Sequence, residues 1–334
     1  MKRITVGFLV IFILALAFLV VPLATRAQQS ERIRRVGWLI PWPENDPIAQ
    51  ASVKTFAHAL EQFGWIEGKN IRIDHRFAAG DPALYKTYAA ELVGLSPDVL
   101  LAGASPAVAP LRQLTSTIPI VFVHVADPIG LGFVQSLARP GGNITGFSAF
   151  DAPMMGKWLQ LLKEIAPGVT RVAVIFNPDT APFASLFNRA IEAAAPSLGM
   201  TVTFAPVHDD TGIEEAIANH AREPGGGLVT LPESFSVTHR NVIIAAAARY
   251  SLPLMGGTEA APRAGGLMSY WFNSIDVHAQ AASYIDRILR GASPANLPVQ
   301  QPMKYSLVIN LKTAQALGLT ISPTLLFQAD EVIR

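Results

Sequence analysis

The chain of 334 residues contains no cysteine, and this absence excludes several kinds of site. Without thiols there is no disulfide, no thiolate nucleophile and no zinc site built on cysteine ligands. A bacterial lipoprotein needs a cysteine to carry its lipid, so that form of membrane attachment is excluded as well.

The chain also lacks an excess of charge of either sign. Its 26 Lys and Arg residues stand against 25 Asp and Glu residues, which gives a formal net charge of +1. No overall electrostatic field draws such a chain onto phosphate backbones or anionic lipid. We therefore expect no nucleic-acid partner.

The motifs of common enzyme classes are missing too. Neither a phosphate-binding G-x-x-x-x-G-K-[ST] loop nor a dinucleotide-binding G-x-G-x-x-G turn follows any predicted strand, and Ala107 stands where a nucleophile elbow at Ser105 would need its second glycine. The seven histidines are scattered, and the nearest acidic cluster, 208–210, is typical of a solvated loop. We expect no catalytic residue, metal ion or cofactor, and predict that the protein is not an enzyme.

The N-terminus has the order of a secretory signal peptide. Lys2 and Arg3 precede an apolar run at 6–21, and the small residues Thr25 and Ala27 precede a polar segment. We predict that residues 1–27 are a signal peptide cleaved after Ala27. The alternative is an uncleaved anchor, because the apolar run approaches the ~20 residues that span a bilayer. Both readings place the folded part outside the cytoplasm, in the periplasm.

From residue 35 onward, short apolar strands alternate with amphipathic helices. The first half shows strands at 36–40, 71–74, 99–102 and 120–125, with helices at 48–63 and 82–95 and another that opens at 105. Such alternation predicts a parallel sheet covered by helices on both faces. A second series with the same rhythm begins near residue 154. The fold class that we expect is therefore α/β, with two Rossmann-like lobes joined by a hinge.

The segment 126–146 interrupts this alternation with proline, glycine and asparagine residues that break regular structure. We place the first crossing between the lobes there. The predicted first lobe comprises 34–146 plus about 273–300, and the predicted second lobe comprises 147–270 plus about 305–334.

In open α/β sheets, ligands bind beyond the carboxyl ends of the strands. In the first lobe, that rule selects Ser105 as a helix N-cap that receives a carboxylate, and Asp127 as an acceptor for an ammonium or hydroxyl group. Trp42 and Glu44 lie in the first strand-to-helix loop. A plain N-cap at Ser105 and a simple turn before Pro128 are the alternatives to a binding role.

In the second lobe, the same rule selects Asn177 and Asp179, which follow the strand at 172–176, and Glu259, which follows 253–255. Turn chemistry is an equally good explanation for Asn177 and Asp179, and we favour it for Glu233. Tyr270 ends a returning strand at 265–270, where an aromatic face can cover a ligand.

Several segments together resemble one protein family. The string Asp127-Pro128-Ile129-Gly130-Leu131-Gly132 and its continuation Pro140-Gly141-Gly142-Asn143-Ile144-Thr145-Gly146 closely resemble the hallmark of the ABC transporter substrate-binding proteins, which include tryptophan- and other aromatic amino-acid-binding members. Further matches occur at 64–71, 115–122, 265–270 and 308–314. Family members usually continue the last Ser-Tyr pair with Gly-Pro-Asp, whereas 271–273 are Trp-Phe-Asn here.

The resemblance implies a type I periplasmic-binding-protein fold with the ligand between the lobes. From the candidate site residues we expect a monomer that binds a small molecule, with an amino acid or small carboxylate favoured, and that docks on a membrane permease. A ligand-sensing protein that signals to a membrane receptor is the alternative function, and an exported hydrolase ranks third. The resemblance does not imply a particular ligand.

Overall fold

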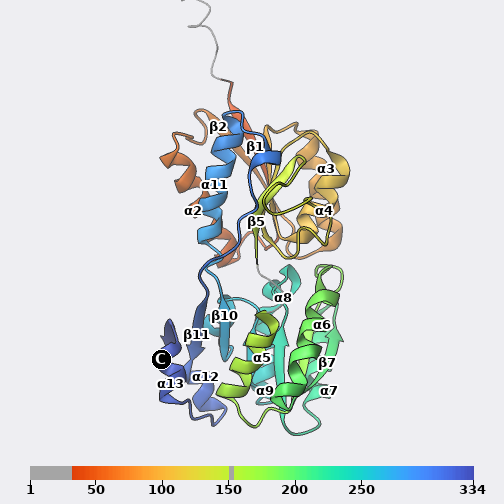
Figure 1. The fold of residues 1–334 in the computed structure, drawn as a ribbon, viewed down its shortest axis with the longest axis vertical. Helices are drawn as coiled ribbons and strands as arrows, with labels where there is room; N and C mark the ends of the chain where they lie inside the picture. Colours follow the sequence, from red (N-terminus) through yellow and green to blue (C-terminus); the bar gives the residue numbers. More distant parts are fainter. Residues whose placement is uncertain (1–31, 150–153) are drawn as a thin grey trace, which may run out of the picture.

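The computed structural model of this protein describes residues 32–149 and 154–334. It consists of two α/β lobes, one above the other in Figure 1, which are joined by extended segments. The predicted signal peptide lies outside the described residues. Within the described parts of the chain, no helix combines the length and the apolar character needed to cross a bilayer.

The first lobe is built on a five-stranded sheet in the order β2-β1-β3-β4-β5, with all strands parallel. Its strands are β1 (Arg34–Ile40), β2 (Ile71–Phe77), β3 (Val99–Gly103), β4 (Ile120–Val125) and β5 (Ile144–Ser148). One face packs against α2 (Pro47–Gln62) and α11 (Asp276–Leu289), and the other against α3 (Pro82–Gly94) and α4 (Ser105–Leu114).

Local sequence explains where the first helices begin. The side chains of Asp46 and Asp81 accept hydrogen bonds from backbone N–H groups at the starts of α2 and α3, and proline occupies the first helical position of each. These helix N-termini lie at the carboxyl ends of the preceding strands. The same edge of the sheet therefore collects both the helix dipoles and the loops that can hold a ligand.

The second lobe contains a seven-stranded sheet in the order β12-β11-β10-β9-β8-β6-β7. Its strands are β6 (Arg171–Phe176), β7 (Thr201–Pro206), β8 (Gly226–Thr230), β9 (Leu254–Gly256), β10 (Met268–Trp271), β11 (Ser306–Asn310) and β12 (Glu331–Ile333). Its helices are α5 (Met154–Ile165), α6 (Ala184–Ala194), α7 (Asp210–His220), α8 (Ser234–Thr238), α9 (Arg240–Arg249), α10 (Ala260–Arg263), α12 (Leu311–Ala316) and α13 (Pro323–Gln328). A short 3₁₀ turn at Ala195–Leu198 follows α6, and a second one, at Pro294–Asn296, follows α11 in the first lobe.

This sheet contains one antiparallel pair, β10 with β11. These two strands are antiparallel because the chain runs toward the first lobe along β10 and returns from it along β11. The predicted fold class, two mostly parallel Rossmann-like lobes joined by a hinge, is confirmed. The sequence pattern did not indicate the short elements α8, α10, α12, α13 and β12.

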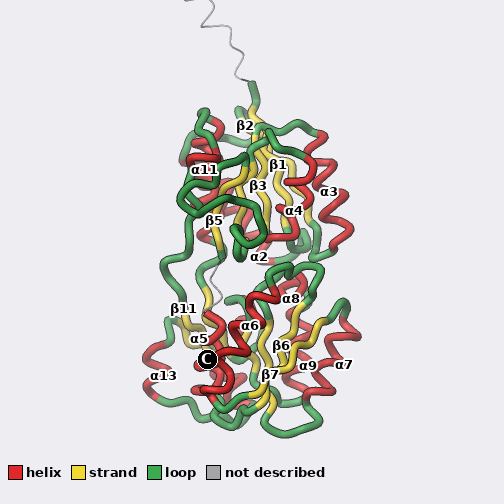
Figure 2. The backbone as a smooth tube through the Cα atoms, turned by 45° about the vertical axis from the view of Figure 1, so that its right-hand side comes forward, coloured by secondary structure: helices red, strands yellow, loops and turns green. Residues whose placement is uncertain are grey.

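The crossing that we placed within 126–146 was wrong. Residues 126–143 connect β4 to β5 inside the first sheet, and the carbonyl of Asn143 accepts a hydrogen bond from the N–H of Ile120. The apolar side chains of this loop, including Val134, pack into the core beside α4 and keep the loop in the first lobe. The chain leaves that sheet only after Ser148, crosses again at 272–275, and crosses a third time at 301–305. Figure 2 shows these connections between the lobes.

Candidate functional site

The candidate site is a hollow of about 30 Å³ between the lobes, where the carboxyl ends of strands from both sheets face each other. It is lined from the first lobe by the loops after β1 and β3, the start of α2 and the end of β4. The second lobe contributes the loops after β8 and β9 and the end of β10, and Ser274 follows on the crossing segment. Its lining residues are Pro41, Trp42, Ile48, Ala104, His124, Pro232, Glu233, Ser234, Val237, Thr258, Trp271 and Ser274. This is the position at which open α/β sheets bind ligands.

A larger hollow of about 420 Å³ lies along the crossing segments, with Phe147, Gln280 and Lys304 among its lining residues. It receives no residues from the loops at the carboxyl ends of β1, β3, β8 or β9. We therefore take the smaller hollow, which both lobes build, as the candidate site.

Aromatic and imidazole rings form the wall of the site on the first-lobe side. The centroid of the His124 ring lies 5.5 Å from the centroid of the Trp42 ring and 5.1 Å from that of the His278 ring. Burial lowers the pKa of His124 to about 4, and burial together with the nearby His124 lowers the pKa of His278 well below its usual value. Both imidazoles are therefore neutral at neutral pH.

Ser274, on the second crossing, links the two lobes by hydrogen bonds. His124 Nε2 lies 3.0 Å from the carbonyl oxygen of Ser274, and Ser274 donates through its N–H and its hydroxyl to Glu259 Oε1. A carbonyl can only accept, so His124 carries its proton on Nε2. His124 Nδ1 is consequently an acceptor, and this buried atom has no partner among the described residues.

Glu259 has a free acceptor of the same kind. Its Oε2 atom is buried and has no hydrogen-bond partner within the described parts of the chain. Burial raises the pKa of Glu259, because removal from water disfavours the charged form. Buried polar atoms without a partner are rare in folded proteins, and they mark places where a bound group or water belongs.

Glu233 also borders the site, but its carboxylate is fully occupied. As the N-cap of α8, it accepts from the N–H groups of Phe235 and Ser236, and also from the hydroxyls of Ser236 and Thr180. Burial raises its pKa as well. The preference for a turn role at Glu233 agrees with these bonds.

Ser105 lies at the start of α4, although not as the N-cap that we expected. Ala104 is the N-cap, with a φ of 65°, and Ser105 is the first residue of the helix. The Ser105 side chain is buried, at 1% exposure, and its Oγ has no partner among the described residues. Because Ala104 lines the hollow, the N–H and the hydroxyl of Ser105, the next residue, lie beside the site.

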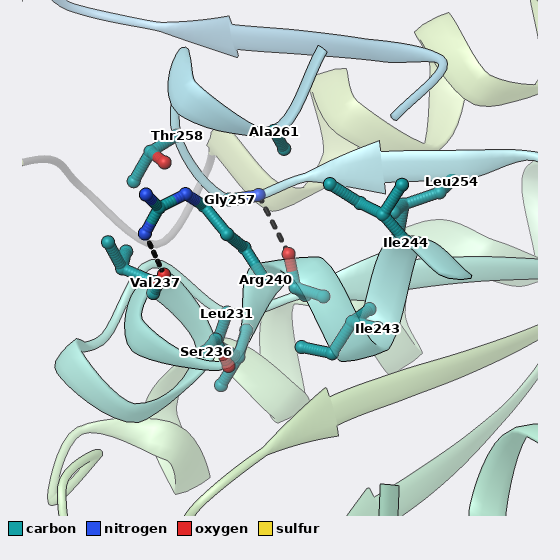
Figure 3. Close-up of a pocket in the computed structure, with 11 residues that line it drawn as sticks. Leu231, Ser236, Val237, Arg240, Ile243, Ile244, Leu254, Gly257, Thr258 and Ala261 are labelled. Atoms are coloured by element: carbon teal, nitrogen blue, oxygen red, sulfur yellow. Dashed lines mark hydrogen bonds between the residues drawn. The ribbon is translucent and has the colours of Figure 1, made fainter. Parts of the chain in front are cut away.

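An ion pair joins the lobes beside the hollow. The guanidinium of Arg240, at the start of α9, donates to Asp46 Oδ2 at 2.7 Å and to the carbonyl of Val237 at 2.7 Å. Figure 3 shows Arg240 reaching toward Thr258, with the bond to Val237 dashed. Asp46 lies in the first lobe and Arg240 in the second, so this pair links the two lobes.

The structure places the predicted site residues unequally. Trp42 lines the hollow. Ser105 and Glu259 do not line it, but each directly follows a residue that does, Ala104 and Thr258 respectively. Asp127 instead accepts from the N–H of Gly130 at 2.8 Å, which is turn geometry, and Glu44 is exposed and does not line the hollow.

The remaining predicted residues engage neighbours of their own. Asn177 Oδ1 accepts from the N–H of Asp179 at 2.8 Å, and Asp179 pairs with His208 at 3.2 Å on the surface. Tyr270 stacks on Tyr305, with ring centroids 5.7 Å apart. The hollow is lined by the next residue, Trp271, because side chains alternate along β10.

Sequence reasoning missed His124, Ser274, Val237 and Arg240. His124 stands one residue before the end of β4, where the register shifts between Phe122 and Val125 and the φ of His124 is 58°. That irregularity turns its ring toward the crossing segment and carries no sequence signal. Ser274 could have been found from the sequence, because it lies three residues after the end of β10 and ligands bind after strand ends.

Comparison with known proteins gives the family directly. Residues 44–333 match the family described as ABC transporter substrate binding protein. The chain belongs to this family. Proteins of this family bind small ligands and deliver them to ABC permeases.

The relatives agree with this assignment. The chain is 24% identical over 273 residues to a "Tyrosine-binding protein" of Clostridioides difficile (strain R20291), covering 82% of this chain and 78% of the relative. A conserved domain protein from Vibrio cholerae O1 biovar El Tor strain N16961 superimposes with a TM-score of 0.83 at 30% identity, over 90% of this chain and 100% of that one. An ABC domain from Streptococcus pneumonia in complex with L-Trp gives a TM-score of 0.82 at 24% identity, over 90% and 99% of the two chains.

Proposed function

We propose that this protein is the extracytoplasmic solute-binding component of an ABC importer, and that it binds a small zwitterion, an amino acid or a similar small carboxylate, in the cleft between its lobes. The observation that carries the proposal is the pair of buried acceptors without partners, His124 Nδ1 and Glu259 Oε2, on either side of Ser274. Each of these buried acceptors needs a hydrogen-bond donor, and an ammonium group offers three N–H donors.

The anionic end of the ligand binds at the start of α4. There the N–H of Ser105, the helix dipole and the Ser105 hydroxyl favour a carboxylate, while Pro106 has no N–H and the N–H of Ala107 already bonds to the Ala104 carbonyl. The printed names of two relatives, which refer to tyrosine and L-Trp, support an amino acid as the ligand class. A carboxylate at one end of the cleft and a helix N-terminus at the other give the ligand a fixed orientation.

Binding closes the lobes. An open form exposes Asp46 and Arg240 to water, and closure brings them together at 2.7 Å while the ligand bridges the two sides. A ligand shifts this equilibrium only by its greater affinity for the closed form, and the ligand contacts from both lobes supply that difference. The closed form then docks on the permease.

The remaining parts of the proposal concern processing and assembly. The mature chain starts after Ala27, resides in the periplasm and acts as a monomer without catalytic activity. Its first lobe comprises about 34–148 with the segment that includes α11, and its second lobe comprises the other described residues.

A thermal-shift screen of the mature chain tests this function. The panel contains amino acids, small carboxylates, sugars and nucleosides, because a ligand that binds only the folded state raises its melting temperature. We expect the largest shift with amino acids and a smaller one with small carboxylates, which lack the ammonium group. A shift confined to sugars or nucleosides, or turnover of the bound compound, would contradict the proposal.

A further inference from the structure

The indole of Trp271 lines the hollow where β10 ends, at the boundary between the second lobe and the crossing segment. It is 3% exposed, so almost all of its surface contacts other residues. An indole in this position is part of the space that a ligand side chain would otherwise fill.

Neighbouring rings hold Trp271 in place. Its ring lies 6.2 Å from that of Trp158 and 4.6 Å from that of Phe272, in the core of the second lobe. Trp158 is itself fixed, because its Nε1 donates to the carbonyl of Tyr270 at 2.9 Å. For Trp271 to swing away, the packed core would have to open a void, which costs free energy in proportion to the volume.

Trp42 restricts the hollow from the first-lobe side. It is almost fully buried and its ring contacts that of His124 at 5.5 Å. With two indoles on its wall, the hollow retains about 30 Å³, which is room for two or three water molecules. Any amino acid requires the lobes to move apart from this arrangement, and a small side chain requires the least widening of the cleft, whereas an aromatic ring requires the most.

We infer that Trp271 is a specificity-determining residue that limits the ligand to amino acids with small side chains, such as glycine, alanine or serine, and excludes aromatic amino acids. The inference rests on the proposed amino-acid binding and narrows its ligand class. Trp271 acts by occupying volume, so its replacement with a small residue opens a space of indole size that is continuous with the site.

Calorimetric titration of the mature chain with L-alanine, L-serine and L-tryptophan tests this inference, using the wild type, Trp271→Ala and Trp271→Phe. We expect the wild type to bind alanine or serine at least tenfold more tightly than tryptophan. Trp271→Ala is expected to gain at least about tenfold in tryptophan affinity, because removal of steric exclusion in a pocket changes affinity by roughly 10–200-fold per methylene-sized group. The tryptophan affinity of Trp271→Phe is expected to lie between those of the wild type and Trp271→Ala. This variant provides the test if Trp271→Ala does not fold.

Trp65→Phe is the matched control, since it changes an indole that does not line the hollow and that bonds to Asp286 in the first lobe. It should leave the order of ligand affinities unchanged. Tight binding of tryptophan by the wild type, or no gain by folded Trp271 variants, would overturn the size limit while leaving the proposed function intact. Absence of amino-acid binding by every variant would overturn both.

Discussion

Two loops of the second lobe bring a buried glutamate to the same cleft, and the two differ in what their carboxylates contact. In the loop after β8, Glu233 accepts bonds from backbone and hydroxyl donors through both of its oxygens. In the loop after β9, Glu259 uses Oε1 for Ser274 and leaves Oε2 without a partner within the described residues. Burial raises the pKa of both, so burial alone does not distinguish a structural acid from a binding one. The number of carboxylate oxygens that already accept a hydrogen bond does distinguish them.

The largest effect should come from removing the satisfied acid. Glu233→Ala leaves the donors of Thr180, Phe235 and Ser236 without an acceptor and removes the cap of α8, so we expect it to lower the free energy of unfolding by about 3 kcal/mol. Urea unfolding followed by circular dichroism measures the change. An unfolding midpoint equal to that of the wild type would show that this loop does not need its acid.

The corresponding change in the other loop should affect binding instead. Glu259→Gln keeps the size of the side chain and an oxygen that accepts from Ser274, but it removes the charge that faces the ligand ammonium. We expect amino-acid affinity to fall by about 2 kcal/mol, or ~30-fold, because one partner of a buried charged pair is lost.

The unfolding midpoint of Glu259→Gln is the control for that prediction. It should be equal to or slightly above that of the wild type, since the variant no longer buries a carboxylate whose pKa is raised by desolvation. A large loss of stability with unchanged affinity would reverse the roles that we assign to the two glutamates.

His124, which bonds to the carbonyl of Ser274, makes the stability of the protein depend on pH. His124 has a folded pKa of about 4, below the ~6.5 of an unfolded histidine, so the unfolded state binds more protons between these values. Stability should therefore fall as pH is lowered through this window, and His124 should contribute about 2 kcal/mol of that loss between pH 7 and pH 5.

His124→Gln removes the titrating group and retains a donor for the Ser274 carbonyl. Urea unfolding at both pH values should show a smaller loss for this variant than for the wild type. Equal losses would mean that His124 has an ordinary pKa in the folded protein. His278 remains in both proteins, but its pKa is lowered by burial and also by His124, so the variant loses part of the contribution of His278 as well.

The smallest effect is expected at Asp127, the acid that follows β4. Its side chain accepts from Gly130 within its own turn, as Glu233 does within its own loop, and it does not line the hollow. Asp127→Asn preserves that turn, so amino-acid affinity and unfolding midpoint should both stay within about 0.5 kcal/mol of the wild type. A tenfold loss of affinity would place Asp127 among the ligand contacts.

The fold was predictable from the sequence because its signals are local. Apolar runs at 99–102 and 120–125, with Asp46 and Asp81 at helix starts, locate strands and helices without reference to distant residues. The loop at 126–143 misled the same reasoning, since its proline and glycine residues mark irregular backbone but do not say which lobe the loop packs against.

The site was only partly predictable because its contacts join distant segments. The rule that ligands bind after strand ends selected Ser105 and Glu259. It also selected Asp127 and Asn177, but the side chains of these two residues bond within their own turns. Which acceptor stays free depends on Ser274, 15 residues beyond Glu259 and 150 beyond His124. Alternation along β10 decides that Trp271 rather than Tyr270 faces the cleft, and that register is set by pairing with β9 and β11.

A crystal structure of the mature chain with the amino acid that gives the largest thermal shift tests the central claim most directly. The account predicts the ligand between the lobes, with its ammonium within hydrogen-bond distance of Glu259 Oε2 and its carboxylate at the start of α4 beside Ser105. A ligand bound outside this cleft, or bound with its carboxylate against Glu259, would contradict the account.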